Sequence, residues 1–213
     1  MIVKISGILD EILEDRLYID VNGIIYEVIV SSTTLKNLAR IGEKIQLRIK
    51  HITREDGQIL YGFASEEEKH WFTELTKVTG LGPKFAINLL SALTPRDIYL
   101  AIAAKDENTL TIANGIGKKL ASRIVMELGS NIDKIPIPAN GKMEIGGTKS
   151  ARAGGGRTSE NLDNRLEDAV NALVALGFQK SAVYQVVLGK LTENPGISID
   201  ELIKQTLGSM ALV

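Results

Sequence analysis

The sequence predicts an α+β protein of several small domains: a five-stranded β-barrel, a helical domain, a flexible tether and a three-helix module. Three observations predict this order. Apolar residues alternate with period two as far as residue 63, and the spacing becomes helical from Ser65. Glycine and proline then gather between residues 134 and 161. At 213 residues the chain is long enough for two or three such domains.

The barrel is expected in residues 1–64, where five segments read as strands: residues 2–9, 17–21, 24–30, 44–50 and 58–63. Asn22-Gly23 joins the second segment to the third, and this pair tolerates the positive φ angles of a tight hairpin turn. The turn at residues 54–57 joins the last two segments. Five strands of this kind are typical of a closed barrel of the OB type, which leaves no exposed edge.

Helices are expected in residues 65–133. Ser65 and Glu68 have the spacing of a capping box, and Thr94-Pro95 with Asp97 marks a second helix start. Within this region residues 75–86 align with residues 110–121 at an offset of 35. Both copies contain Gly-x-Gly followed by lysine, so a pattern that is weak evidence in one copy becomes informative.

Each Gly-x-Gly is expected to turn the chain tightly between two helices and to leave the first N–H groups of the second helix pointing outward. Such amides, with the positive end of the helix dipole, form a site for a phosphate oxygen. The nearby Lys84, Lys118, Lys119 and Arg123 would add positive charge. A contact of this kind reads no base, so binding should not depend on DNA sequence. The alternative is that each motif is only a structural turn.

Residues 134–161 are expected to be a flexible linker, because they are rich in glycine and proline and lack an apolar pattern. Residues 162–213 return to helical spacing, with Leu162 and Leu176 at the two ends of the first apolar stripe. Glycine after that stripe, and Ser198 before a third helix, predict a three-helix, UBA-like module.

The composition of the chain argues against several classes of function. The net charge of −1 argues against binding by bulk positive charge, so any anion site must be built locally. With no cysteine and two isolated histidines, the sequence predicts no metal site, no thiol nucleophile and no cofactor. It has no P-loop, so ATP hydrolysis should belong to a partner. Without a long apolar run or signal peptide, a cytoplasmic location and no membrane are expected.

The repeated segments VTGLGPKFAINLL and ANGIGKKLASRIVMEL resemble the helix-hairpin-helix motif, and the order of barrel, tandem motif, tether and helical module resembles the RuvA family of bacterial Holliday-junction recognition subunits. The segment 54–63 is similar to the acidic hairpin of that family. The resemblance implies a homotetramer, or an octamer on DNA, that holds a four-way junction open. It also implies a partner, the RuvB-type hexameric ATPase motor, and a possible junction resolvase as a further partner.

Carried onto this chain, the resemblance implies a non-catalytic protein with three sets of site residues. The DNA-binding set is Thr79, Gly80, Gly82, Lys84, Asn114, Gly115, Gly117, Lys118, Lys119 and Arg123. Glu55 and Asp56 would form an acidic pin that repels phosphates at the junction centre, although Asp-Gly is also ordinary turn chemistry. The motor would bind within residues 162–213.

Two other functions remain as alternatives. A DNA repair enzyme, either a nuclease or a glycosylase, could use helix-hairpin-helix elements to hold its substrate, but it would need a catalytic constellation that is not evident. An OB-fold protein that binds single strands would need stacking platforms, and aromatic residues make up only 5% of the chain. Trp71 and Phe72 are expected to pack between domains rather than stack on bases.

Overall fold

The structure is a computed structural model, and it describes residues 1–38, 40–55, 57–135, 157–178 and 180–210. These residues form two compact units, the first up to Gly129 and the second beyond it. Each unit is described by itself.

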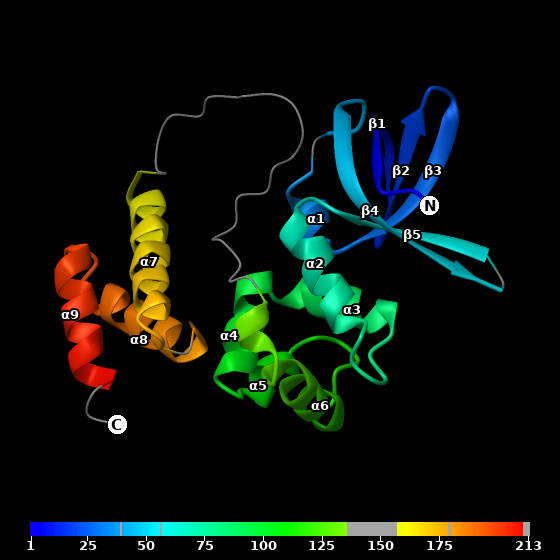
Figure 1. The fold of residues 1–213 in the computed structure, drawn as a ribbon. Coiled ribbons are helices and arrows are strands. Elements are labelled where there is room, and N and C mark those ends of the chain that lie inside the picture. Colours follow the sequence, from blue (N-terminus) through cyan, green and yellow to red (C-terminus); the bar gives the residue numbers. More distant parts are fainter. Residues whose placement is uncertain (39, 56, 136–156, 179, 211–213) are drawn as a thin grey trace. The chain divides into compact units, whose positions relative to one another are not determined.

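The N-terminal part of the first unit is a closed barrel, as the alternating pattern predicts (Figure 1). Its strands are β1 (Lys4–Ile12), β2 (Arg16–Val21), β3 (Ile24–Val30), β4 (Lys44–Arg54) and β5 (Gly57–Phe63). They pair in the order β1-β2-β3-β5-β4, and β4 closes the barrel onto β1. All neighbours are antiparallel except β3 and β5, which run parallel.

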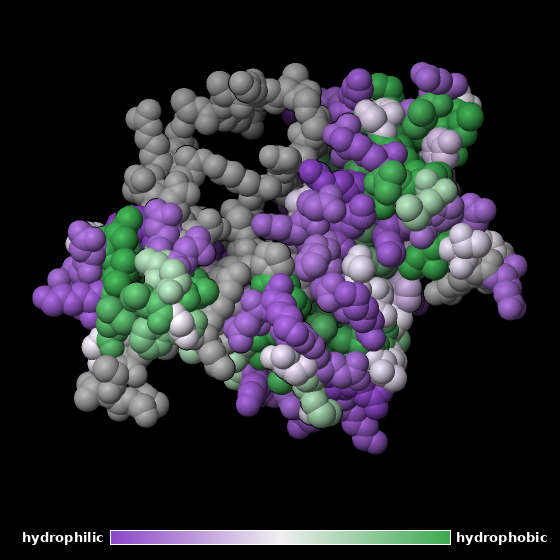
Figure 2. Space-filling model, viewed as in Figure 1, coloured by the Kyte–Doolittle hydropathy of each residue, from purple (hydrophilic) through white to green (hydrophobic). Residues whose placement is uncertain are grey.

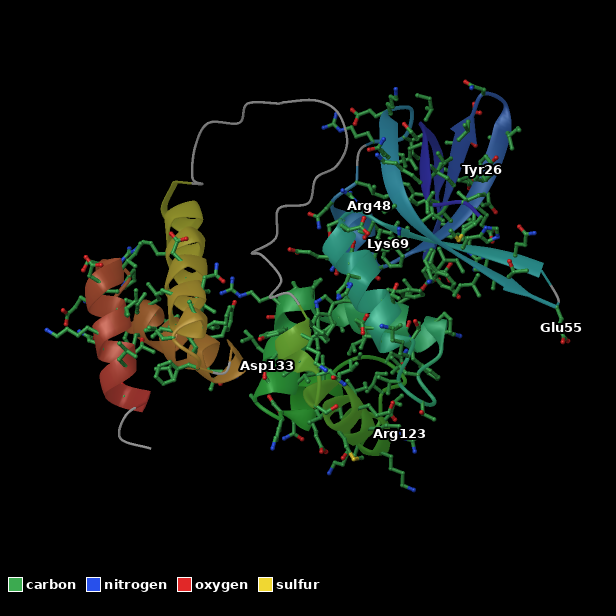
Figure 3. The ribbon with its side chains drawn as sticks, in the orientation of Figure 1. Tyr26, Arg48, Glu55, Lys69, Arg123 and Asp133 are labelled. Carbon is green, nitrogen blue, oxygen red and sulfur yellow. The ribbon has the colours of Figure 1, made fainter. Side chains whose placement is uncertain are left out.

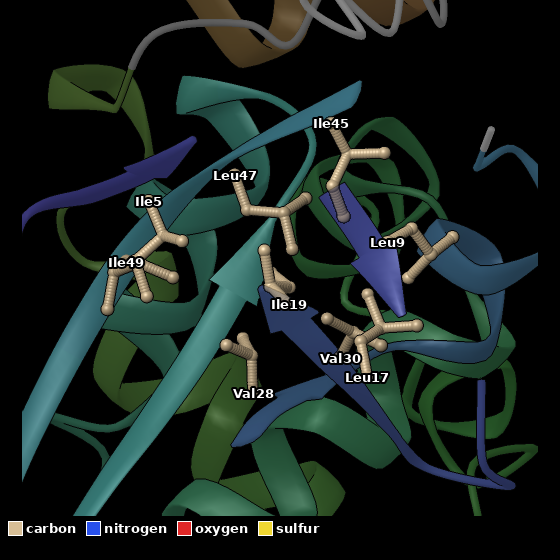
Figure 4. Close-up of a cluster of buried hydrophobic side chains, with 9 residues drawn as sticks. All are labelled: Ile5, Leu9, Leu17, Ile19, Val28, Val30, Ile45, Leu47 and Ile49. Carbon is tan, nitrogen blue, oxygen red and sulfur yellow. The ribbon is translucent and has the colours of Figure 1, made fainter. Parts of the chain in front are cut away.

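The alternation of the strands builds the barrel interior (Figure 4). Nine aliphatic side chains fill it, and each is at most 5% exposed: Ile5, Leu9, Leu17, Ile19, Val28, Val30, Ile45, Leu47 and Ile49. The turn between β2 and β3 has φ angles of 54° at Asn22 and 89° at Gly23, so the hairpin turn predicted from this pair is confirmed. Ile24 and Ile25, which follow the turn, are 60% and 50% exposed. Figure 2 shows hydrophobic and hydrophilic residues side by side on the surface of the first unit.

The hairpin of β4 and β5 extends beyond the barrel (Figure 1). Strand β1 pairs with β4 only as far as Arg48, and β3 pairs with β5 only at Tyr61 and Gly62. Beyond these pairs the ladder continues between β4 and β5 alone, to the pair Arg54 and Gly57. The outer end of the hairpin is therefore a two-stranded arm.

A short helix that the sequence did not predict, α1 (Ser32–Lys36), follows β3. Ser31 caps it by accepting a hydrogen bond from the backbone N–H of Thr34. The helix contacts the first helical repeat, because the hydroxyl of Thr33 donates to the carbonyl of Leu90 (3.1 Å) and Ser32 N–H donates to the hydroxyl of Ser91 (3.0 Å). It therefore ties the barrel to the helical part of the unit.

The capping box predicted at Ser65 is only half formed. Ser65 accepts from the N–H of Glu68, as predicted, but the Glu68 carboxylate does not return to the Ser65 backbone. It is buried, and it accepts from the hydroxyls of Ser31 (2.9 Å) and Thr34 (3.0 Å) and from the N–H of Ala64 (3.1 Å). Tertiary partners on α1 compete successfully for this side chain.

Five helices complete the first unit: α2 (Glu66–Leu75), α3 (Pro83–Ala92), α4 (Pro95–Ala103), α5 (Glu107–Leu110) and α6 (Lys118–Gly129). The predicted capping box between Thr94 and Asp97 is complete at the start of α4. Trp71 and Phe72 on α2 are 1% and 0% exposed, which confirms that they pack in the interior. Phe72 lies 5.0 Å from the ring of Phe63 on β5, and so joins the barrel to the helices.

The second unit contains a short 3₁₀ helix, η1 (Ile132–Lys134), and the helices α7 (Arg157–Ala175), α8 (Lys180–Glu193) and α9 (Ile199–Met210). The three α-helices pack against one another. Residues 136–156, most of the predicted linker, lie outside the described residues. Helix α7 begins at Arg157, five residues before the apolar pattern starts at Leu162, because its first turn is polar and carries no periodic signal. Leu176, predicted in the apolar stripe, is 63% exposed since α7 ends at Ala175 and Gly177 turns the chain at φ 96°.

Candidate nucleic-acid interface

Two loops, loop 1 (residues 79–82) and loop 2 (residues 114–117), have the same hydrogen-bonding pattern. In loop 1 the N–H of Leu81 donates to the carbonyl of Val78, and in loop 2 the N–H of Ile116 donates to the carbonyl of Ala113, both at 3.0 Å. The carbonyls of Gly82 and Gly117 then each accept from the two residues that begin the next helical ladder. The repeat at an offset of 35 is therefore a repeat of local structure.

The first glycine of each loop supplies the turn. Gly80 has φ 85° and Gly115 has φ 84°, a region that glycine enters without strain. The residue between the glycines is buried, Leu81 at 2% and Ile116 at 4% exposed, and anchors the loop to the core. The space beside the second glycine is empty, because a Cβ added at Gly82 or Gly117 would meet nothing within 4 Å. The backbone at the second glycine is open to a ligand.

Each loop opens a helix whose N–H groups before the first helical hydrogen bond lack an intrahelical acceptor. In α3 this group is the N–H of Lys84, because Pro83 has none, and in α6 these groups are the N–H groups of Lys118 and Lys119. Gly82 caps α3 and makes no side-chain capping bond, and α6 begins at Lys118, directly after Gly117. The side chains of Lys84, Lys118 and Lys119 are exposed beside these amides. Free amides, the positive end of a helix dipole and lysine ammonium groups are the components of an oxyanion site. The structure places the three lysines at the starts of α3 and α6, and their contact with phosphate stays a prediction.

Arg123 lies on α6, one turn beyond the lysines, and reaches the other repeat (Figure 3). Its Nη1 donates to the carbonyl of Thr79 in loop 1 at 3.0 Å. The N–H of Thr79 donates in turn to the carboxylate of Glu127 at 3.1 Å. Thr79 is therefore held at both its N–H and its carbonyl by α6, which sequence reasoning did not foresee.

Sequence reasoning also missed two residues that hold loop 2. The side-chain amide of Asn88 on α3 donates to the carbonyl of Asn114 at 3.0 Å. The ring of Phe85 packs against Gly115, and a Cβ added at Gly115 would lie 2.6 Å from Phe85 Cε1. Asn88 could have been found from the repeat, because it stands 35 positions before Arg123.

One acidic group of the barrel, Asp15, has a pKa that neighbouring positive charges lower. The side-chain hydrogen bond from Arg16 lowers the pKa of Asp15 from its ordinary value of 3.8, and the positive charge of Lys84 acts in the same direction. Arg16 Nε lies 2.8 Å from the Asp15 carboxylate. The Asp15 carboxylate therefore stays ionised to a lower pH than usual, and Lys84, which follows loop 1 at the start of α3, contributes to this shift of its pKa.

Glu55 is exposed at the tip of the two-stranded arm, away from the barrel core (Figure 3). Asp56, the second residue of the predicted acidic pin, lies outside the described residues. Among the residues that the structure describes, no group of three or more acidic or histidine side chains could hold a metal ion. Within this same part of the chain, no helix combines the length and the apolar character that a membrane span requires.

Comparison with known proteins agrees with this order of elements. Residues 1–62 match the family model described as the RuvA N-terminal domain, residues 72–130 match the SAM-like helix-hairpin-helix tandem, and residues 164–211 match the RuvA C-terminal domain. A protein of Rickettsia felis named Holliday junction branch migration complex subunit RuvA is 40% identical over 211 residues, which cover 97% of each chain. A protein of the same name from Pelodictyon phaeoclathratiforme is 37% identical, over 99% of this chain and 98% of its own.

Proposed function

The chain belongs to the RuvA family, and on that premise we propose that it binds four-way DNA junctions by their shape and holds them for branch migration. The observation that carries the proposal is the pair of equivalent loops. Both present an unobstructed glycine, the free end of a helix and exposed lysines. Two such sites suit the two backbones of one DNA arm, and contacts to the backbone carry no sequence information.

The proposed DNA contacts come from both loops and from the helices that follow them. Backbone amides near Gly82 and Gly117 would bind phosphate oxygens, and Lys84, Lys118 and Lys119 would neutralise the phosphates around them. Thr79 and Asn114 would shape the entry to each loop. Arg123 has further N–H donors besides the one used on Thr79, so it can both hold loop 1 and meet a phosphate.

The arm formed by β4 and β5 would place Glu55, with Asp56, at the centre of the junction. In a homotetramer, four copies of the pair would present about eight carboxylates to the crossing strands, and like charges repel at short range. This repulsion would separate the strands without any chemical step. Replacing the pair by Gln and Asn should leave junction affinity equal or higher and change the migration rate. Metal-dependent strand cleavage by the purified chain would overturn the proposal and favour the nuclease alternative.

The remaining parts are proposed to serve assembly in the cytoplasm. The chain would act as a tetramer, or an octamer on DNA, with no catalytic activity and no cofactor of its own. The ATPase would be a RuvB-type hexameric motor that docks on residues 162–213, tethered by the part of the predicted linker 134–161 that lies between η1 and α7. Removing residues 162–213 should abolish stimulation of the motor and leave junction binding intact, and stimulation that survives would refute this docking site.

The experiment that tests the main proposal is a gel shift with single strand, linear duplex and four-way junction of equal length. Comparison at several salt concentrations is needed because phosphate contacts weaken as salt rises. The proposal expects a strong preference for the junction. Equal affinity for linear duplex would favour a repair enzyme, and preference for single strand would favour an OB-fold single-strand binder.

A further inference from the structure

Each of the two loops is held by a helix from the other repeat. Asn88 on α3, in the first repeat, donates to the carbonyl of Asn114 in loop 2 at 3.0 Å. Arg123 on α6, in the second repeat, donates to the carbonyl of Thr79 in loop 1 at 3.0 Å. Both donors and both acceptors are 35 positions apart.

The two hydrogen bonds therefore join equivalent positions, one from the first repeat to the second and the other from the second repeat to the first. The donor position of the first repeat contacts the acceptor position of the second, and the donor position of the second contacts the acceptor position of the first. Reciprocal contacts of this kind are the mark of two copies related by a two-fold axis. Here that relation lies within one chain, and each repeat positions the loop of its counterpart. A change in the orientation of either loop would break the hydrogen bond that it accepts from the helix of the other repeat.

Each of these two hydrogen bonds, here called a brace, holds the carbonyl directly before the glycine of positive φ. The carbonyl of Thr79 precedes Gly80 (φ 85°), and the carbonyl of Asn114 precedes Gly115 (φ 84°). A hydrogen bond to each carbonyl fixes the orientation of the peptide plane between that residue and the following glycine. This plane sets the course of the loop toward the free N–H groups at the start of the next helix. Further contacts add to the braces but differ between loops, with Glu127 accepting from Thr79 N–H and Phe85 packed beneath Gly115.

We propose that Asn88 is a positioning residue for loop 2, and that the Asn88 and Arg123 braces together fix the spacing of the two phosphate sites before DNA arrives. The inference rests on the proposed function, since it assumes that both loops bind phosphate. Its physical basis is preorganisation, because a loop already held in its bound geometry loses less conformational freedom on binding. Asn88 itself is not assigned a DNA contact.

The test replaces Asn88 by Leu in the full chain, which keeps the branched shape and removes the donor. Junction dissociation constants are measured from about 50 to 200 mM salt. Loss of one hydrogen bond should weaken binding by about threefold to tenfold. The slope of log affinity against log salt should stay at the wild-type value, whereas Lys118→Ala should reduce it by about one unit, as loss of a phosphate contact does.

A matched control is Asn108→Leu. Asn108 is an exposed asparagine of the same unit, and within the described residues its side-chain amide makes no hydrogen bond. This variant should bind as the wild type does. Hydrogen exchange of the Ile116 amide gives a reading on the protein alone, because that amide donates inside loop 2. Exchange should become faster in Asn88→Leu and stay unchanged in Asn108→Leu.

The repeat also provides a rescue. Since the equivalent position carries Arg123, Asn88→Arg should restore slow exchange at Ile116, and its added charge should raise affinity together with the salt slope. Wild-type affinity and unchanged exchange in Asn88→Leu would overturn the proposal. If the wild-type chain itself shows no preference for junctions, the proposed function fails, and the exchange data still decide whether Asn88 positions loop 2.

Discussion

The two glycines of loop 2 should respond to alanine in opposite ways. Gly115 has φ 84° and packs against Phe85, so Gly115→Ala should destabilise the fold. Gly117 has no atom within 4 Å of an added Cβ, so Gly117→Ala should fold normally. The methyl group of that alanine would instead stand where a phosphate has to approach the backbone. One variant therefore tests the turn and the other tests the binding surface.

The magnitudes follow from the contacts. A left-handed conformation costs a residue with a side chain about 1–2 kcal/mol. The new Cβ of Gly115→Ala would also lie 2.6 Å and 2.8 Å from two carbons of the Phe85 ring, and overpacking of this kind costs about 1–3 kcal/mol. Together the free energy of unfolding should fall by about 2–5 kcal/mol. At Gly117 it should change by less than about 1 kcal/mol.

Guanidinium unfolding followed by tryptophan fluorescence measures these changes. Trp71 is the single tryptophan of the chain and is buried on α2, so its emission reports on the first unit and not on the C-terminal module. For Gly115→Ala the unfolding midpoint should fall by about 0.5–1 M. For Gly117→Ala the midpoint should stay at the wild-type value while junction affinity falls about tenfold, as loss of a charge-assisted contact implies.

A second substitution separates the two causes in Gly115→Ala. Adding Phe85→Leu removes the ring that the new methyl group meets, so the double variant should lose less than the sum of the single losses. Strict additivity would show that the ring does not obstruct the Cβ. Wild-type affinity in Gly117→Ala would refute the view that DNA approaches the backbone at this glycine.

Three further substitutions test other parts of the first unit by the same unfolding assay. Glu68→Ala leaves two hydroxyls and the N–H of Ala64 without their buried acceptor, and should cost about 2–4 kcal/mol. The hydrogen bond from Thr109 lowers the pKa of Asp106 below 3.8, so the stabilisation by this carboxylate is present above that pH and lost below it. The difference between wild type and Asp106→Ala should therefore shrink as pH falls below 3.8, and a constant difference would contradict the assignment. Gly7→Ala should lower the midpoint by closing the gap to β2, where the added Cβ would meet a backbone carbonyl.

The barrel and the two loops were predictable because their signals are local. The alternation of Leu17 and Ile19 with polar neighbours indicates which face is buried, and Asn22-Gly23 can form the tight turn without long-range help. The repeated Gly-x-Gly segments likewise predict, from neighbouring residues alone, a turn at positive φ followed by a helix. Contiguous residues specify backbone geometry of this kind, so the local sequence is sufficient to predict it.

Side-chain partners depended on the tertiary structure. The sequence gives Glu68 the spacing of a capping residue, yet α1 supplies hydroxyls that draw its carboxylate into the interior. Arg123 reads as a phosphate ligand, and only the packing of one repeat on the other shows that it and Asn88 also hold the opposite loops. A hydrogen bond between distant residues requires both ends to be brought together by packing, which no local pattern records. The sequence by itself thus determined the barrel strands, the two repeated turns and their order, and the tertiary structure added α1 and decided which side chains fix these elements in place.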